Sequence, residues 1–205
     1  QDGLATTWHE NGQEKNEVSY RIAFIVDYSL SMKGMDKVMR AELEAAVNKM
    51  TPVDILPDKE VYNSVCLIFF SGPSWLAGEN ASEIQKKWTG DNANGFRPKR
   101  GFEPSKPKWI PVTPSIKKQL SKVIWRTPLA FGSAWDNSFR WALTKLDPKP
   151  DVIYFMTNGF VGVAEGRKGM EVIKTHRGST KIYTIGYGTP SKARILLQEI
   201  AVMTG

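Results

Sequence analysis

The most constraining feature of the sequence is a short apolar run that ends in one acidic residue and two serines. Residues 22–26 carry no charge, and four of the five are β-branched or aromatic. Such a run is typical of a strand buried on both faces of a parallel sheet. Asp27, Ser29 and Ser31 follow it, so a carboxylate and two hydroxyls are expected at the carboxyl end of this strand. In open α/β sheets, ligands bind at that end.

Segments typical of strands and of helices alternate along the chain. The strands are predicted at 18–26, 64–70, 151–156 and 181–185. The helices are predicted at 35–50, 115–124, 136–146, 166–176 and 191–204. This alternation predicts an α/β fold with a doubly wound, mostly parallel sheet flanked by helices, in the Rossmann-like manner.

Length and composition fit one domain preceded by an arm. The chain has 205 residues, of which 41% are apolar, and this is enough for one well-buried domain. Residues 1–17 are polar and lack apolar periodicity, so we expect an N-terminal arm before a domain at 18–205. No apolar run is long enough to cross a membrane, and we therefore expect no transmembrane segment and no signal peptide.

The cysteine, histidine and glycine patterns exclude several kinds of site. Cys66 is the only cysteine, which excludes a disulfide framework and a multi-cysteine zinc site. With only His9 and His176, a histidine-rich metal site is not expected. Residues 186–191 mimic a dinucleotide-binding turn but lack its third glycine and an acidic partner for the ribose. Because no catalytic constellation is present, we do not expect an enzyme.

Positive charge is concentrated in one stretch of the chain. The net charge is +7 overall, whereas residues 86–126 hold eleven basic and two acidic residues, a local net charge of +9. Prolines and glycines interrupt 78–114, which we interpret as an irregular basic insert, extending to 126, with a short edge strand near 108–112. Its aromatic residues are Trp88, Phe96, Phe102, Trp109 and Trp125. They could stack on single-stranded nucleic acid, or fix a solvated loop to the domain, which is the interpretation we favour.

The residues after the first strand resemble the first motif of the von Willebrand factor A family. The sequence Asp27-Tyr-Ser29-Leu-Ser31 matches Asp-x-Ser-x-Ser. The resemblance covers roughly residues 18–205 and implies a metal-ion-dependent adhesion site that is built from three loops. The alternative is a turn whose Asp and Ser side chains only cap the next helix.

A second loop of the family site normally contains Gly-Thr before a helix. Ser133 follows a glycine and takes the place of this threonine. Phe139 and Ala142 then lie at the offsets where the family's helix turns apolar residues inward. Thr127 is the alternative, and we rank it second because the same offsets from it lead to Ser133 and Asp136, a poor core face.

The third motif of the family is Thr-Asp-Gly after a buried strand. Thr157-Asn158-Gly159 matches it, except that Asn158 replaces the aspartate. An amide oxygen can still face a cation but brings no charge, so Asp27 remains the only matched carboxylate. We therefore expect weakened affinity for divalent cations, with Asp136 as a carboxylate that could compensate.

The resemblance thus implies an Mg²⁺ site. Its predicted ligands are Asp27, Ser29, Ser31, Ser133 and Asn158. Carboxylate, hydroxyl and amide oxygens are the ligands that this cation prefers. The resemblance also implies a protein partner whose acidic residue completes the coordination, and an extracellular or periplasmic location. We predict a protein-binding domain of the adhesion or scaffold type, with binding of nucleic acid or another polyanion through 86–126 as the alternative.

Overall fold

A mostly parallel sheet forms the centre of the computed structural model, which describes residues 4–10, 13–50, 53–56 and 59–204. The sheet has six strands in the order β10-β6-β3-β11-β12, and β7 also pairs with β6. The parallel strands are β3 (Arg21–Asp27), β6 (Ser64–Phe70), β11 (Val152–Thr157) and β12 (Lys181–Gly186). The antiparallel strands are β7 (Ser74–Leu76) and β10 (Ile110–Pro111). The predicted fold class is therefore confirmed.

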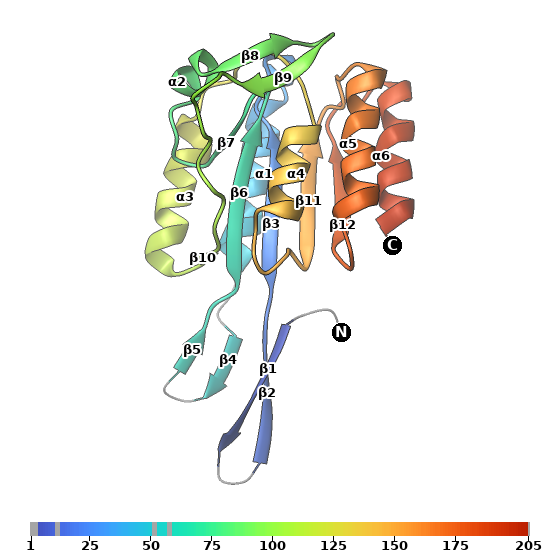
Figure 1. The fold of residues 1–205 in the computed structure, drawn as a ribbon. Helices are drawn as coiled ribbons and strands as arrows, with labels where there is room; N and C mark the ends of the chain where they lie inside the picture. The colour runs from blue at the N-terminus through green and yellow to red at the C-terminus, as the bar shows by residue number, and fades with distance from the viewer. Residues whose placement is uncertain (1–3, 11–12, 51–52, 57–58, 205) are drawn as a thin grey trace.

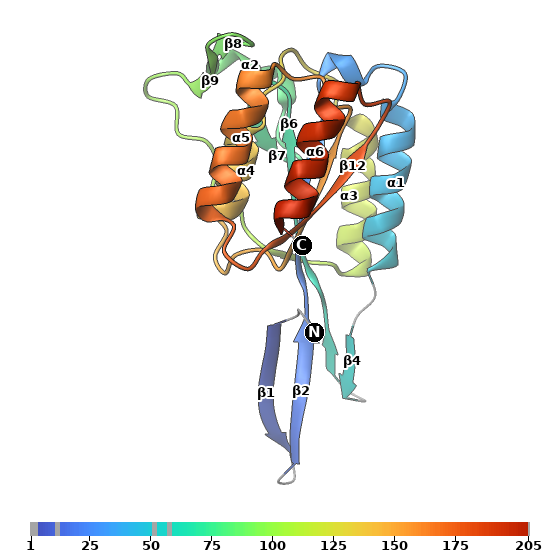
Figure 2. The ribbon, with the colours of Figure 1, turned by 90° about the vertical axis from the view of Figure 1, so that its right-hand side faces the viewer.

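Helices lie on both faces of this sheet. Figure 1 and Figure 2 together show α4 and α5 on one face, α1 and α3 on the other, and α6 beside α5 against β12. The helices are α1 (Asp36–Lys49), α2 (Ala81–Lys86), α3 (Pro114–Arg126), α4 (Asp136–Thr144), α5 (Val163–His176) and α6 (Ser191–Thr204). Within the described part of the chain, no helix combines the length and apolar character needed to cross a membrane.

The basic insert contains more regular structure than the sequence predicted. It holds α2 and a hairpin of β8 (Trp88–Asp91) and β9 (Gly95–Pro98), in addition to the expected edge strand, β10. Local side-chain bonds create these elements. Asn80 accepts hydrogen bonds from the backbone N–H groups of Ser82 and Glu83 and so caps α2. The sequence did not predict these elements because the prolines and glycines of the insert interrupt any apolar periodicity.

Two further hairpins lie outside the central sheet. β1 (Leu4–Glu10) pairs with β2 (Gln13–Ser19) where the sequence predicted an arm, and β4 (Val53–Leu56) pairs with β5 (Lys59–Val61). Figure 1 shows both at the end of the sheet opposite the β8–β9 hairpin. The sequence did not predict β2 because residues 13–17 are all polar, which leaves no apolar alternation to recognise.

An aromatic cluster fixes β11 to the helices on the α4 side of the sheet. The Phe155 ring centroid lies 5.8 Å from Phe70, 5.0 Å from Trp135 and 4.8 Å from Phe139. All four side chains are fully buried. Because Trp135 directly precedes α4 and Phe70 ends β6, this cluster also holds the carboxyl ends of the strands and the adjoining loop in place.

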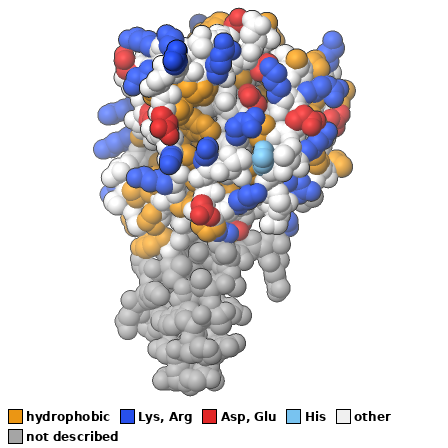
Figure 3. Space-filling view, viewed as in Figure 1, with side chains coloured by type: hydrophobic (Ala, Val, Ile, Leu, Met, Phe, Trp, Pro, Cys, Tyr) orange, Lys and Arg blue, Asp and Glu red, His pale blue; other side chains and the backbone are white. Residues whose placement is uncertain are grey.

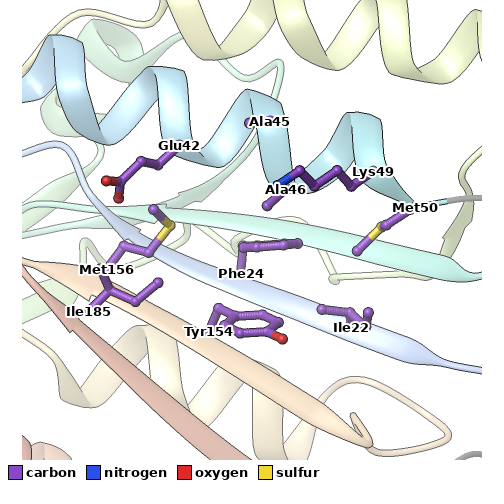
Figure 4. Close-up of a pocket in the computed structure, with 10 residues that line it drawn as sticks. All are labelled: Ile22, Phe24, Glu42, Ala45, Ala46, Lys49, Met50, Tyr154, Met156 and Ile185. Atoms are coloured by element: carbon purple, nitrogen blue, oxygen red, sulfur yellow. The ribbon is translucent and has the colours of Figure 1, made fainter.

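The opposite face is open beside α1. A groove of about 480 Å³ runs between α1 and the strands β3, β11 and β12, lined mostly by apolar side chains (Figure 4). The rings of Phe24, Tyr154 and Tyr183 stack across these strands with centroids 5.3 and 5.5 Å apart. Tyr183 is 46% exposed, and the outer edge of β12 pairs with no other strand in the described part of the chain.

Removing the central ring of the aromatic cluster should destabilise the fold strongly. We expect Phe155→Ala to lower the free energy of unfolding by about 3–5 kcal/mol, because it deletes a fully buried ring in contact with three others. Tyr183→Ala is the matched control on the neighbouring strand, and about 1 kcal/mol is expected there because the ring is half exposed. Urea denaturation of both variants measures the difference; equal losses would contradict the role given to the cluster.

Candidate metal centre

The register of two parallel strands brings the first and third motifs together. Val26 pairs with Met156, so Asp27 and Thr157 lie side by side at the ends of β3 and β11. The Thr157 hydroxyl donates a 2.6 Å hydrogen bond to Asp27 Oδ2, and the Ser29 backbone N–H donates a 2.9 Å bond to Asp27 Oδ1. Both oxygens of a fully buried carboxylate are therefore held by neutral donors.

Burial dominates the electrostatics of this carboxylate. It raises the pKa of Asp27 above the ordinary aspartate value, although the hydrogen bonds from Ser29 and Thr157 act in the opposite direction. A buried negative charge that is compensated only by neutral groups remains costly. A cation bound beside Asp27 would remove that cost.

The first loop (residues 27–32) is also bonded to the third loop (residues 157–162). Ser29 Oγ and Ser31 Oγ lie 2.7 Å apart, and Ser31 Oγ makes a longer 3.4 Å bond to Asn158 Oδ1. The Asn158 side-chain amide donates to the Ser31 carbonyl at 2.8 Å, and Asn158 Oδ1 accepts from the Phe160 N–H at 2.9 Å. The structure thus brings together four of the five predicted ligands, Asp27, Ser29, Ser31 and Asn158.

The bond from Asn158 to Ser31 shows what the amide can do at the position where the family motif has an aspartate. An amide nitrogen can donate to the Ser31 carbonyl, whereas a carboxylate at the same place would direct an oxygen at that carbonyl. Asn158 therefore links the two loops directly. A carboxylate at this position would need a positive charge, such as a cation, between itself and the Ser31 carbonyl.

The second loop (residues 127–135) adjoins the first loop through its backbone. The Ala130 N–H donates to the Tyr28 carbonyl at 2.7 Å, and the Ala130 carbonyl accepts from the Leu30 N–H at 2.9 Å. Farther along, the Ala134 N–H donates to the Ser71 carbonyl, directly after the end of β6. Three strand ends therefore support the candidate centre.

The two hydroxyls proposed for the second loop have different environments. Thr127 Oγ1 donates to the Val123 carbonyl at 2.8 Å, as part of the C-terminal end of α3. Ser133 Oγ is buried and has no hydrogen-bond partner, while the Ser133 N–H donates to Asn92 Oδ1 at 3.0 Å. Among the described residues, no hydrogen bond joins Ser133 to the other four predicted ligands, and of the two hydroxyls only that of Ser133 has no partner.

Asp136 is not hydrogen-bonded to the Asp27 cluster. Burial and the nearby Glu165 carboxylate raise the pKa of Asp136, and Glu165 is itself 1% exposed and ion-paired with Lys168 at 2.5 Å. Asp136 therefore belongs to a second carboxylate pair between α4 and α5. No hydrogen bond of the described residues supports the prediction that Asp136 compensates for the carboxylate that Asn158 replaces.

One site residue was absent from the predicted ligand set. Thr157 is the first residue of the third motif, and its hydroxyl holds the Asp27 carboxylate and also accepts from the Gly159 N–H at 2.9 Å. The parallel register of β3 and β11 was the signal that could have placed it beside Asp27.

The donor set fits a hard divalent cation of modest affinity. Within the described residues, no group of three or more His, Cys, Asp or Glu side chains is suited to a metal ion. A site here would instead combine one carboxylate with hydroxyl and amide oxygens, which suits Mg²⁺ or Mn²⁺ better than a softer metal. The unpartnered Ser133 hydroxyl and the uncompensated Asp27 charge both fit such an ion.

The basic insert is attached to the domain mainly by its aromatic side chains. Trp88 and Phe96 are buried, and Phe102 and Trp109 pack against the core. Of the five aromatic residues, only Trp125 is largely exposed, at 44%. Figure 3 shows many Lys and Arg side chains on the face that it draws, around an apolar area. The charge is thus exposed, whereas most of the rings that could stack on bases are not.

The raised pKa of Asp27 predicts how stability changes with pH in the absence of metal. The folded-state pKa of Asp27 exceeds its unfolded-state value. The loss of stability caused by burying its charge therefore develops as the pH rises from the unfolded-state pKa to the folded-state pKa, and it is constant above that interval. We expect Asp27→Asn to unfold at a higher temperature than the wild type at pH 7 in EDTA. This difference should shrink as the pH falls from the raised folded-state pKa to the ordinary carboxyl pKa, and it should change no further below that value. Thermal unfolding of both proteins across pH checks it, and a pH-independent difference would contradict it.

Comparisons with known proteins support the fold through structure and not through sequence. No family model and no curated protein sequence matches the chain. The pilus adhesin SpaC from Lactobacillus rhamnosus GG matches with a TM-score of 0.60 at 13% identity, over 91% of this chain and 27% of that one. The conserved hypothetical protein BatB from Bacteroides thetaiotaomicron matches with a TM-score of 0.55 at 11% identity, over 91% and 87%.

The manganese-loaded TRAP protein from Plasmodium vivax matches with a TM-score of 0.53 at 10% identity, over 90% of this chain and 63% of that one. The chain spans 43% of a von Willebrand factor type A protein from Catenulispora acidiphila, with a TM-score of 0.48 at 10% identity. The TM-scores of the adhesin, BatB and TRAP, at identities of 10–13%, show a common fold and nothing finer. The chain therefore has the fold of von Willebrand factor A domains, as its sequence motifs predicted.

Proposed function

We propose that this chain is a non-catalytic protein-binding domain of the adhesion or scaffold type. In this proposal, residues 18–205 bind a divalent cation at the carboxyl ends of β3 and β11, and an acidic residue of the partner binds that cation. The observation that carries the proposal is the buried Asp27 carboxylate, which is bonded to a hydroxyl and to a backbone N–H and to no positively charged side chain of the described residues.

Each polar residue of the centre has a distinct part in this proposal. Asp27 supplies the negative charge, and Ser29 and Ser31 supply hydroxyl oxygens from the first loop. Ser133 supplies a hydroxyl that has no other bond to lose. The bound cation supplies the charge that offsets the burial of Asp27 and attracts a carboxylate of the partner.

The neighbouring structures support this kind of function without identifying a partner. One is a pilus adhesin, and another was solved loaded with manganese. An extracellular or periplasmic location is part of the proposal, and the pilus adhesin is the neighbour that supports it. His176, the one histidine with a described side chain, ends α5 at the far end of the domain, so it forms no catalytic pair with the serines (Figure 1).

Asn158 should make the cation affinity low. A unit charge about 4 Å from the ion contributes roughly 4 kcal/mol at an effective dielectric near 20, before desolvation. If a water-mediated contact retains about a third of that, the missing carboxylate costs about 1.4 kcal/mol, or roughly tenfold in affinity. Occupation of the site would then depend on the local cation concentration.

Restoring the carboxylate should therefore have two opposite effects. We expect Asn158→Asp to bind Mg²⁺ and Mn²⁺ at least about tenfold more tightly in calorimetric titrations. In EDTA the same variant should be less stable by about 1–3 kcal/mol, because an oxygen then faces the Ser31 carbonyl. Asn48→Asp, the same change at the exposed C-terminal end of α1, is the control. Unchanged cation affinity in Asn158→Asp would remove the third loop from the site.

Two hydroxyl deletions should identify the ligand of the second loop. We expect Ser133→Ala to weaken Mn²⁺ binding by several-fold, because its unpartnered hydroxyl is available to the ion. Thr127→Ala should leave Mn²⁺ binding unchanged, because the bond to the Val123 carbonyl holds its hydroxyl at the C-terminal end of α3. Calorimetry on the two variants decides, and the reverse pattern would place the second loop at Thr127.

A further inference from the structure

Large apolar side chains are exposed on all three loops of the candidate centre. Leu30 in the first loop is 54% exposed, Phe131 in the second is 57% exposed, and Phe160 in the third is 66% exposed. Val163, at the start of α5 directly after the third loop, is 51% exposed. These are four of the nine large apolar residues that are exposed in the described part of the chain, so such residues are concentrated at this end.

Hydrogen bonds join the three loops at or beside three of these residues. The Leu30 N–H donates to the carbonyl of Ala130, the residue before Phe131. The Phe160 N–H donates to Asn158 Oδ1, and the Asn158 amide donates to the Ser31 carbonyl, which follows Leu30 in the chain. The loop that carries Leu30 is thus bonded both to the residue before Phe131 and, through Asn158, to Phe160. We call these three residues the apolar collar.

The collar adjoins the accessible side of the candidate centre. Asp27, Ser29, Ser133 and Asn158 are buried, whereas Ser31 is partly exposed. Ser31 is also the residue next to Leu30 and is bonded to Asn158. A partner group that approaches a cation held by these oxygens would therefore pass beside the collar.

The collar has no evident role in the stability of the fold. None of its three residues belongs to the hydrophobic core or to the partly buried residues that pack against it. Isolated exposed apolar residues are common and need no explanation, but a group of them beside a buried polar centre is typical of a binding surface. In such surfaces, apolar anchors exclude water from a central polar contact and so strengthen it.

The charges outside the collar favour an acidic partner. Gln85 Nε2 donates to the Phe131 carbonyl, so the end of α2 lies next to Phe131. There Lys86 is ion-paired with Glu83, and the exposed Lys87 follows it. Lys33 is exposed directly after the first loop. The exposed acid of the neighbouring hairpin, Asp91, directs Oδ1 to the N–H groups of its own turn.

Resting on the proposed function, we infer that the partner is a protein segment whose acidic residue is flanked by bulky apolar side chains. Its carboxylate binds the cation, and its flanking side chains pack on Leu30, Phe131 and Phe160. The collar thus selects among acidic segments by their flanking side chains, while the cation requires that the segment carry a carboxylate.

Four fluorescent peptides and three variants of the chain test this inference. The peptides are Gly-Phe-Asp-Phe-Gly, its Ser-flanked form Gly-Ser-Asp-Ser-Gly, and the same two sequences with Asn in place of Asp. Fluorescence polarisation in Mn²⁺ should show the Phe-flanked Asp peptide binding about tenfold more tightly than the Ser-flanked one, since each buried ring removes apolar surface from water. EDTA, or Asn in the peptide, should abolish binding.

The variants assign this preference to the collar. Phe131→Ser and Phe160→Ser should each weaken the Phe-flanked peptide several-fold and leave the Ser-flanked Asp peptide unchanged, which shows that the metal centre is intact. Val202→Ser, which changes an apolar residue 84% exposed on α6, is the matched control and should change neither.

The outcomes separate the inference from the proposed function. Equal binding of the Phe- and Ser-flanked Asp peptides in Mn²⁺, with loss in EDTA, overturns the collar and leaves the cation-bridged function intact. Binding of the Phe-flanked peptides that persists in EDTA and with Asn contradicts both, since neither cation nor acid is then needed. An absence of binding by all four peptides in Mn²⁺ also contradicts both.

Discussion

The candidate centre depends on one buried hydrogen bond, from the Thr157 hydroxyl to the Asp27 carboxylate. It forms because β3 and β11 are parallel neighbours in a register that ends both strands at the same level. A hydrogen bond to a charged group contributes about 1.5–3 kcal/mol to stability. Burying the carboxylate charge costs more free energy than one such bond returns. The aromatic cluster around Phe155 packs β11 against β6 and α4. The position of Thr157 beside Asp27 therefore depends on the packing of the sheet.

Asn158 changes how the first and third loops are connected. In this chain the amide bonds directly to the Ser31 carbonyl, so the two loops are joined by a side-chain hydrogen bond. The same substitution removes a charge that would hold the ion. In the proposed function, the chain would therefore have a lower cation affinity and a direct bond between these two loops. Such a centre suits binding that responds to changes in cation concentration or to the arrival of a partner carboxylate.

The sequence was sufficient for the four parallel strands of the sheet because they are mostly apolar, whereas it did not predict the short antiparallel strand β7. Residues 22–26 and 64–70 have a composition that is typical of buried strands, and the motif residues Asp27, Ser29, Ser31 and Asn158 follow strands whose ends meet in the structure. Strand pairing then places these residues without further information. This is why most of the candidate site could be predicted from one sequence.

The features that escaped prediction depend on contacts between distant residues or on local turn chemistry. The position of Ser133 relative to the other ligands depends on a hydrogen bond to Asn92 in a hairpin that proline and glycine concealed. The apolar collar could not be recognised either, because Leu30, Phe131 and Phe160 lie in separate loops and look like core residues in the sequence. Their exposure is a property of the folded chain alone.

Paramagnetic relaxation by Mn²⁺ tests the central claim most directly, because it locates the ion on the intact protein. In a titration followed by nuclear magnetic resonance of the backbone amides, the signals of Ser29, Ser31 and Asn158 should broaden first and should recover on addition of EDTA. Selective broadening elsewhere, for example at exposed acids such as Asp91 and Glu171, with these three signals unaffected, would contradict a metal centre at the ends of β3 and β11.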